Sequence, residues 1–512
     1  MAIIPEIKLP KAIASALWLS RKDPRSQQEK VLKKLLTKAR FTSFGQQYRF
    51  DDILMKQDPV KHFQQWVPVH DYQKIYDEWW IQTLDGVPDV TWPGKIYYYA
   101  LSSGTSESAS KYIPVTKDML RSNRVNYLRQ LLSLISYEKL PRNAVTKGFL
   151  MLGGSTDLQK GKAGWYAGDL SGILMKNKPF WFQTFYKPGG RIAAMKDWNQ
   201  KLSEIVENAK EWDIGYIVGV PAWCQMCMEM VIEHYKVKNI HEIWPNLGFF
   251  VHGGVAFQPY KKGFERLLGK PIVYIENYLA SEGFIGFKDK QNAKGIRLVL
   301  NNNIFMEFVA FDEKNFDSEG KMVDNPVTFL VDEVEEGKEY ALLMSTNSGA
   351  WRYLIGDTIR FVDKKRSEIV ITGRTKHFLS LVGEHLSVDN MNKAIEMVSN
   401  ELNICIPEFT VVGLPYENFF AHQWYIATND EVNADELKQK LDQYLCILND
   451  DYAVERTSAL KDVLVKVLPE DTFLKFMELK GKVGSQHKFP RVLKGKMLED
   501  WNRYLSNEGI HI

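Results

Sequence analysis

The stretch IYYYALSSGTSESASK, residues Ile96–Lys111, determines how the rest of the chain is interpreted. Its β-branched and aromatic start predicts a strand, and the strand ends at a loop of hydroxyl side chains around Gly104. Such a loop offers backbone N–H groups and hydroxyls to phosphate oxygens, and Lys111 adds a positive charge. The segment therefore indicates a nucleotide phosphate site. The alternative is an ordinary polar turn with a helix-capping hydroxyl.

The spacing of glycine and lysine differs from that of the best-known nucleotide loops. The nearest Walker-like string, Gly263 to Lys270, has one residue too many, and Pro271 follows where Ser or Thr should stand. No G-x-G-x-x-G occurs, so a Rossmann site has no support. No G-x-S-x-G occurs either. The His252–Gly254 string resembles the oxyanion loop of a hydrolase, but the nucleophile elbow that accompanies such a loop is missing from the sequence.

Composition indicates a globular protein of two or three domains, with 512 residues, 45% hydrophobic and 25% charged. The net charge of +3 is the difference between 66 basic and 63 acidic residues, which argues against an obligate nucleic-acid binder. No stretch approaches the length of a membrane span. Among four cysteines, Cys224 and Cys227 form a C-x-x-C at a predicted helix start, where we expect buried structural thiols rather than zinc or redox chemistry. We therefore expect a reduced, cytoplasmic protein with neither nucleic acid nor membrane as partner.

The hydrophobic period divides the chain into four successive parts. The first ninety residues are predicted to be helical, and α/β alternation follows. A β-rich part is predicted from period-two patterns at 296–310, 326–332, 340–345 and 359–362. The α/β pattern restarts after Arg374, so we place the domain boundary there. Ligands of open α/β sheets bind where parallel strands end, and four loops are expected at such ends: Ser102–Ser106, Gly153–Ser155, His252–Gly254 and Tyr278–Gly283.

Four further residues stand in motifs that suit nucleotide chemistry. Glu282 follows an apolar strand and precedes a glycine, where a carboxylate can help phosphate oxygens to hold Mg²⁺. Asp357 follows a glycine turn and can accept hydrogen bonds from ribose hydroxyls, although a turn-forming aspartate is equally expected. Arg374 lies in a Thr-Gly-Arg string at the boundary and suits a hinge that touches a charged ligand. Lys488 lies in QHKFPR, which alone is an ordinary basic surface segment.

These motifs, in this order, resemble the acyl-adenylate-forming superfamily, and most closely the Gretchen Hagen three family of acyl-acid amido synthetases. The resemblance covers nearly the whole chain, including LLTKARFTSFGQQYRF before residue 51, FQQWVPVHDY at 63–72 and WPGKIYYYALSSGTS at 92–106. It implies an α/β fold. A large N-terminal domain, 1–373, would combine α/β subdomains with a β-barrel-like part, and a small mobile α/β domain, 374–512, would cap it.

The resemblance also implies roles for individual residues. The phosphate loop corresponds to Ser102, Ser103, Gly104, Thr105 and Ser106. The adenine and metal loop contains Tyr278, Ala280, Ser281 and Glu282, with Glu282 at the Mg²⁺ position. Asp357 matches the ribose-binding aspartate, Arg374 the hinge and Lys488 the C-terminal basic motif. This chain departs from the pattern at Glu107 and Ser108, where many relatives have a second glycine, and we expect Glu107 to point outward.

The implied reaction is ATP-dependent adenylation of a small carboxylic acid, followed by transfer of the acyl group to an amine, expected to be an amino acid. Two alternatives remain open: an acyl-CoA ligase of the same superfamily, and a non-catalytic protein that binds a nucleotide or acid. We place the acyl pocket between the 215–230 helix and the 252–260 loop, although ordinary core is the more usual role for any one of its predicted lining residues, Tyr216, Trp223, Met226, Gly253 and Phe257. ATP and Mg²⁺ are the expected cofactors, and the expected state is a monomer or weak homodimer.

Overall fold

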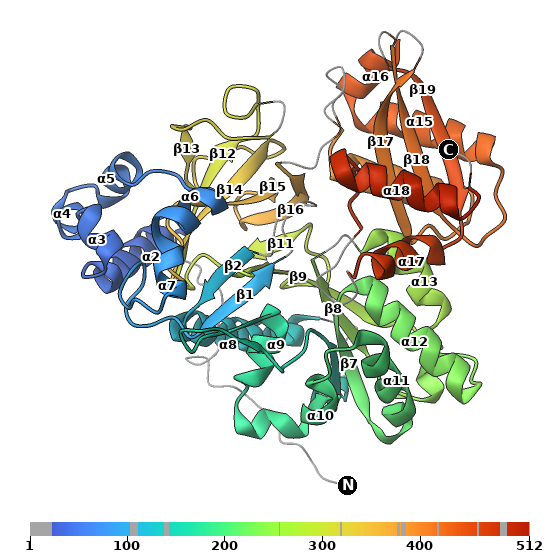
Figure 1. Cartoon of the computed structure of the whole chain (residues 1–512), viewed down its shortest axis with the longest axis horizontal. Coiled ribbons are helices and arrows are strands. Elements are labelled where there is room, and N and C mark those ends of the chain that lie inside the picture. Colours follow the sequence, from blue (N-terminus) through green and yellow to red (C-terminus); the bar gives the residue numbers. More distant parts are fainter. Residues whose placement is uncertain are drawn as a thin grey trace.

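The computed structural model describes residues 23–102, 111–137, 143–254, 257–317, 320–375, 379, 386–416, 419–457, 460–481 and 489–510. Three sheets organise this part of the chain, with twelve, four and three strands. Figure 1 shows the large sheet running through the middle of the molecule and the three-stranded sheet standing beside it. The mixed α/β class that the sequence predicts is confirmed.

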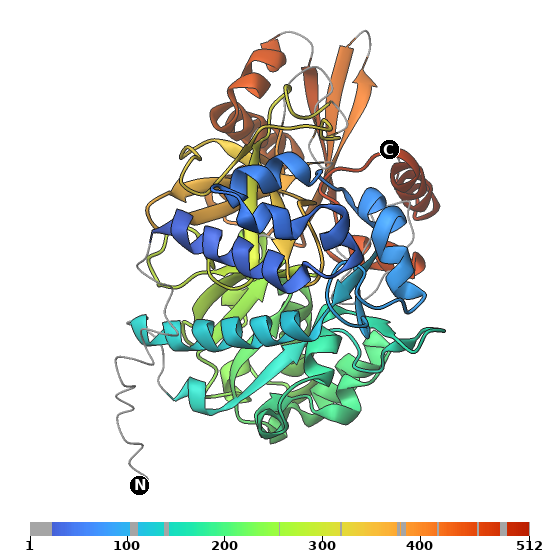
Figure 2. The same cartoon turned by 90° about the vertical axis from the view of Figure 1, so that its left-hand side faces the viewer.

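The predicted helical start of the chain is present as a layer of helices over one end of the large sheet (Figure 2). Asp23 caps the first of them by accepting a 2.8 Å hydrogen bond from Ser26 N. Inside the layer, Gln28 is buried and its amide donates to the carbonyls of Leu300 and Ile304 at 2.8 and 3.0 Å. The helices are α2 (Pro24–Ala39), α3 (Ser43–Gln47), α4 (Phe50–Met55), α5 (Pro59–Trp66), α6 (Tyr72–Ile75) and α7 (Ile81–Leu84), with a π-turn over Tyr76–Trp80.

The twelve-stranded sheet has a parallel part and an antiparallel part, in the order β13-β12-β14-β15-β16-β11-β10-β9-β8-β7-β3-β6. The parallel strands are β3 (Gly148–Leu152), β6 (Tyr186–Lys187), β7 (Ile214–Gly219), β8 (Phe249–Gly253) and β9 (Val273–Ala280). The antiparallel strands are β10 (Gly283–Phe287), β11 (Ile296–Leu298), β12 (Ile304–Ala310), β13 (Thr328–Phe329), β14 (Glu339–Thr346), β15 (Tyr353–Asp363) and β16 (Glu368–Arg374). The predicted β-rich part is thus continuous with the α/β part, because β9 and β10 form a hairpin between the two.

Register brings the carboxyl ends of the parallel strands together. Gly219 of β7 lies opposite His252 of β8, and His252 lies opposite Glu276 of β9. Gly253 is required where it stands, because a Cβ there would lie 2.3 Å from Oδ1 of Asn277. Three of the four predicted ligand loops therefore begin at one edge of this sheet.

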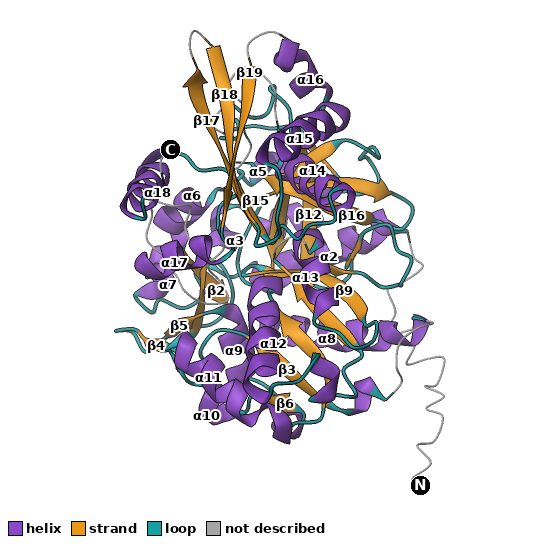
Figure 3. Cartoon of the chain, turned by 90° about the vertical axis from the view of Figure 1, so that its right-hand side faces the viewer, coloured by secondary structure: helices purple, strands orange, loops and turns teal. Residues whose placement is uncertain are grey.

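Helices cover both faces of the parallel half (Figure 3). On one face α11 and α12 pack with β3 and β8 in a single apolar cluster. Cys224 and Cys227 are buried in that cluster, where burial raises the pKa of Cys227 to about 12. The helices of this half are α8 (Lys117–Ser133), α9 (Leu170–Lys176), α10 (Gly190–Ala193), α11 (Trp198–Asn208), α12 (Pro221–Tyr235) and α13 (Gln258–Arg266).

The strand that carries the opening motif lies in the four-stranded sheet, not in the large one. β1 (Tyr98–Ser102) pairs antiparallel with β2 (Lys111–Val115) and parallel with β5 (Tyr166–Gly168), and β4 (Gln159–Lys160) completes the order β2-β1-β5-β4. The expectation that this loop follows a strand of the open parallel sheet was wrong, because β1 pairs with the strand that comes next in the chain. The loop therefore connects two strands of a hairpin, and Ser102 faces Lys111 across it.

The C-terminal part has its own core and sheet. The strands β17 (Glu408–Tyr416), β18 (Phe419–Ala427) and β19 (Leu460–Leu468) are packed with α14 (Val388–Glu401), α15 (Ala434–Leu448), α16 (Asp450–Thr457), α17 (Asp471–Leu479) and α18 (Gly495–Asn507). It contacts α13, where Arg266 pairs with Asp430 at 3.0 Å and Tyr260 donates to Glu408 at 3.2 Å, and it contacts β15, where Arg360 pairs with Asp389 at 2.8 Å. In the described residues, no helix is both long and apolar enough to cross a bilayer.

Candidate active site

Glu282 lies in the tight turn that joins β9 to β10. Ala280 and Gly283 are paired across the turn, so that only Ser281 and Glu282 connect the two strands. Gly283 is held close to β12, since a Cβ there would lie 2.9 Å from Cδ1 of Ile304. The carboxylate of Glu282 is only 7% exposed, which places it inside the molecule at the edge where the parallel strands end.

Asp357 and Arg374 are cross-strand neighbours on β15 and β16. Gly356 precedes the aspartate with φ of +88°, a conformation that favours glycine, and its carbonyl accepts a 2.9 Å hydrogen bond from Thr375 N. Nε of Arg374 lies 2.9 Å from Oδ1 of Asp357. The hydroxyl of Tyr278 donates to Oδ2 of the same carboxylate at 2.6 Å. Both oxygens of Asp357 are therefore held before any ligand arrives.

The electrostatics join Glu282 to the same group of side chains. Burial raises the pKa of Glu282, Asp357 raises it further, and Lys111 and Arg374 oppose the shift. The pKa of Arg374 is raised, chiefly by Asp357. Burial and the neighbouring Glu282 carboxylate raise the pKa of Tyr353. We call Lys111, Glu282, Asp357 and Arg374 the charged cluster: two carboxylates and two cations from four segments of the chain.

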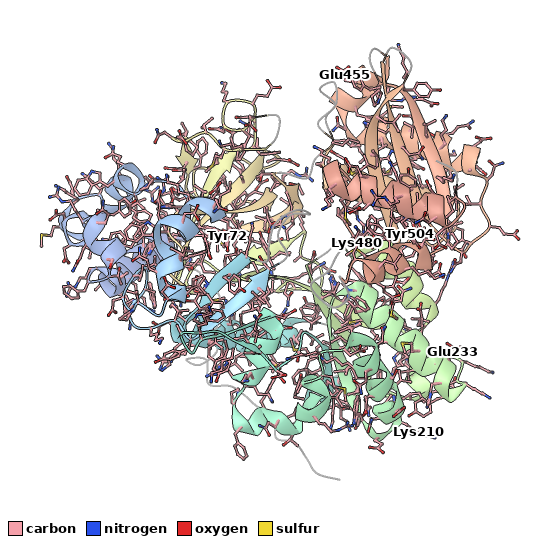
Figure 4. All side chains as sticks on the ribbon, in the orientation of Figure 1. Tyr72, Lys210, Glu233, Glu455, Lys480 and Tyr504 are labelled. Carbon is pink, nitrogen blue, oxygen red and sulfur yellow. The ribbon has the colours of Figure 1, made fainter. Side chains whose placement is uncertain are left out.

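Sequence analysis predicted Lys111 only as a supporting positive charge beside the hydroxyl-rich loop. In the structure it begins β2 directly after that loop, its Nζ lies 5.1 Å from the ring centroid of Tyr72, and its charge acts on Glu282. Figure 4 labels Tyr72, which lies near the middle of the molecule. Its place as the first cation after the loop is the sequence signal that points to this role.

Several predicted site residues fall outside the described residues, namely Ser103, Gly104, Thr105, Ser106 and Lys488. Ser102 is described and half-buried at the end of β1. Its register partner is Lys111. The described end of β1 therefore lies opposite Lys111, a member of the charged cluster.

The predicted acyl-pocket residues do not form one wall. Trp223, Met226 and Phe257 belong to the apolar cluster around α11 and α12, and Phe257 also stacks on His252 with ring centroids 4.6 Å apart. Tyr216 packs on the opposite face of β7, stacked between two phenylalanine rings of the neighbouring strands β3 and β8. Strand alternation explains the separation, because Ile217, the next residue, faces the α11 and α12 cluster.

The charged cluster suits a nucleotide with a hard divalent cation. A buried carboxylate with a raised pKa gains from a nearby cation, and carboxylate oxygen is a ligand that Mg²⁺ prefers. No group of three or more His, Cys, Asp or Glu side chains that could hold a metal occurs among the described residues. A cation bound by Glu282 would therefore take further ligands from phosphate oxygens and water.

Comparison with known sequences places three family profiles along the chain. The GH3 family N-terminal domain matches residues 15–203, the GH3 family central domain matches 297–374, and the GH3 family C-terminal domain matches 389–496. The indole-3-acetic acid-amido synthetase GH3.4 of Arabidopsis thaliana is 24% identical over 92% of this chain and 89% of its own length.

Comparison with solved structures supports the same fold. The GH3.15 acyl acid amido synthetase superposes with a TM-score of 0.75 and 17% identity, over 97% of this chain and 95% of that one. A 2-hydroxyisobutyryl-CoA ligase in the postadenylation state gives a TM-score of 0.56 with 10% identity, over 94% and 92% of the two chains. The predicted adenylate-forming fold is thereby confirmed.

Proposed function

Because the chain belongs to the GH3 family, we propose that it is an ATP-dependent acyl-acid amido synthetase. It joins a small carboxylic acid to an amine, which we infer to be an amino acid, and releases AMP and pyrophosphate. The observation that carries the proposal is the charged cluster, because a carboxylate with two organised hydrogen-bond donors lies beside a buried carboxylate suited to Mg²⁺.

The first step brings two anions together. A carboxylate oxygen of the acid attacks the α-phosphorus of ATP, and the bond to the pyrophosphate oxygen breaks. We infer that Asp357 accepts hydrogen bonds from the ribose hydroxyls, with Tyr278 and Arg374 fixing its orientation. Lys111 and the N–H groups of Ser103–Ser106 would lower the energy of the developing charge on the phosphate. Removing one such donor typically costs about 3–4 kcal/mol of barrier.

Mg²⁺, when bound at Glu282, would neutralise phosphate charge. Ala280 and Ser281 lie in the same turn and, with Tyr278, form the wall that we assign to the adenine. In the second step the amine nitrogen attacks the acyl carbon. The electron pair of the acyl C–O bond leaves with AMP, and the amine proton passes to solvent.

We further propose that the domains divide at 373/374 and that the C-terminal domain, 374–512, turns about Arg374 between the two steps. The separate three-stranded sheet of this part supports the division. Lys488 would then approach the phosphates in one orientation only. A cytoplasmic setting and a monomer or weak homodimer are the inferred context, and the free cysteines are consistent with a reduced compartment.

Isotope exchange between pyrophosphate and ATP tests the first step without knowledge of the amine. Exchange that depends on one carboxylic acid, and that Glu282→Ala abolishes, is expected. Product analysis with amino acids and with CoA then separates an amido synthetase from an acyl-CoA ligase, whose fold the chain shares. No exchange with any acid in a broad panel would contradict the proposal and favour a binding protein.

A further inference from the structure

Lys201 is a buried ammonium that the proposed reaction does not use. It is the fourth residue of α11 and only 3% exposed. Its Nζ donates a 2.9 Å hydrogen bond to the carbonyl of Gly153, the residue that follows β3. Because α11 runs back along the sheet, its first turn lies where β3 ends, at the edge that open α/β sheets use for ligands. A buried cation at this edge requires a physical account.

The Lys201 ammonium has more N–H donors than hydrogen-bond acceptors within the described residues. An ammonium has three N–H bonds, and within the described residues the carbonyl of Gly153 is its hydrogen-bond acceptor. Asp169 acts on Lys201 through its charge, but Oδ1 of Asp169 accepts from the backbone N and the hydroxyl of Ser171, both at 2.6 Å. Burial lowers the pKa of Lys201 to about 8. The amine therefore lies where an additional anion would stabilise its charged form.

A second donor lies beside it. Trp198 begins α11, and Nζ of Lys201 lies 5.5 Å from the centroid of its ring. Nε1 of Trp198 is buried and has no hydrogen-bond partner among the described residues. The first turn of α11 lies in the same region, and its N-cap Asp197 accepts a 2.7 Å hydrogen bond from Gln200 N. Two side-chain donors and a helix terminus thus share one small region.

The loop facing these donors is built tightly. Gly154 N donates to Oγ of Ser171 at 2.9 Å, and Thr156 N donates to the carbonyl of Ala193 at 2.9 Å. Gly154 allows close contact, because a Cβ there would lie 2.2 Å from Cβ of Asp169. Trp198 also meets Trp223 of α12 edge-on, with centroids 4.8 Å apart. The region is thus held by α9, α11 and α12 together.

We propose that the Lys201 ammonium and the Trp198 indole N–H form an oxyanion subsite at the carboxyl end of β3, and that it binds a second carboxylate at the far end of the acyl substrate. The assignment of the occupant rests on the proposed function, because it takes the acid to lie along this sheet edge. A carboxylate that pairs with the ammonium and accepts its hydrogen bonds would offset the free-energy cost of burying a cation whose N–H groups lack acceptors. The substrate class is then a dicarboxylic acid.

Ligand-induced thermal stabilisation tests the subsite without turnover. The probes are straight-chain α,ω-dicarboxylates of five to seven carbons and the monocarboxylates of equal length, at matched ionic strength. We expect one dicarboxylate to raise Tm in a concentration-dependent manner and its monocarboxylate partner to have a much smaller effect. Lys201→Met should weaken dicarboxylate binding by about tenfold or more. Lys210→Met is the matched control, because Lys210 is exposed at the surface (Figure 4).

A second variant keeps the test decisive if Lys201→Met folds poorly. Trp198→Phe removes the N–H and keeps an aromatic ring, and it should also reduce dicarboxylate binding. No stabilisation by any dicarboxylate, or equal stabilisation with and without Lys201, would overturn the subsite. Stabilisation without pyrophosphate exchange would leave the subsite standing and refute the proposed reaction. If pyrophosphate exchange is faster with monocarboxylates and Lys201→Met leaves it unchanged, the proposed reaction stands and the subsite is refuted.

Discussion

The Tyr278 hydroxyl lies 2.6 Å from Oδ2 of Asp357, which places a buried phenol from the β9 strand against the carboxylate that we assign to the ribose. Tyr278→Phe removes only this hydrogen bond and leaves Arg374 on the other oxygen. A hydrogen bond to a charged group contributes about 1.5–3 kcal/mol, so KM for ATP should rise by about tenfold or more, with a smaller change in the KM for the acid.

The control for this variant is Tyr274→Phe. Tyr274 stands four residues earlier on the same strand, and its hydroxyl is buried without a hydrogen-bond partner in the described residues. Its removal should leave KM for ATP unchanged. Equal effects of the two variants would show that Tyr278 serves strand packing rather than nucleotide binding.

Glu282→Gln should raise the Mg²⁺ concentration needed for half-maximal pyrophosphate exchange and lower the exchange rate by about 10²-fold. The amide keeps the size of the side chain but loses the anionic oxygen that a hard cation prefers. The measurement is a Mg²⁺ titration of exchange at fixed ATP. An unchanged titration curve would remove Glu282 from the metal site.

Lys111→Met should move the acid limb of the pH–rate profile to higher pH. Lys111 lowers the pKa of Glu282, so its removal raises that pKa further, and the ionised carboxylate is then lost at a higher pH as the solution is acidified. Lys117→Met is the matched control, because Lys117 is exposed and its Nζ also lies over a tyrosine ring, 5.7 Å from the centroid of Tyr97. If both variants show the wild-type profile, Lys111 does not act on Glu282.

Stability should fall on acidification because of His70. His70 is fully buried, its Nδ1–H donates to the carbonyl of Trp351 at 2.8 Å, and burial lowers its pKa to about 4. The unfolded state binds the proton near pH 6.5, so stability is present above that pH and is lost as the pH falls toward 4.

Protonation linked to His70 should lower the free energy of unfolding by about 2 kcal/mol between pH 7 and pH 5, at about 1.4 kcal/mol per pKa unit. Urea denaturation at the two pH values measures it. His70→Asn retains an N–H donor without a titrating ring, so the difference between the two pH values should shrink in that variant. An equal difference in both proteins would assign the acid sensitivity to other groups.

Local sequence patterns were sufficient to predict the helices and strands that have a strong hydrophobic period and clear ends. The strands predicted at 340–345 and 359–362 lie within β14 and β15, and Cys224 and Cys227 lie in the first half of α12, where a helix start was expected. The α/β and β-rich parts were also predicted from the sequence, as were three members of the charged cluster, because Glu282, Asp357 and Arg374 each adjoin a glycine in a recognisable motif.

Non-local pairing accounts for what sequence reasoning missed. β2 contains Pro114 and lies at the edge of its sheet, where proline is tolerated, so nothing local marked it as the partner of β1. Tyr216 was grouped with Trp223 because the face that α12 covers is known only after packing. Lys201 resembles a solvated charge on an amphipathic helix, and only the fold shows that it is buried.

The ion pair of Asp357 with Arg374, and the electrostatic effect of Lys111 on Glu282, have a consequence for how nucleotide binding depends on the solution. The resting site is close to electroneutral without any ligand. A triphosphate therefore meets little net attraction from the protein alone. In the proposed reaction, nucleotide occupancy would depend on positive charge that Mg²⁺ and Lys488 would bring to the site. Nucleotide affinity measured without Mg²⁺ should accordingly be weak and only slightly sensitive to ionic strength.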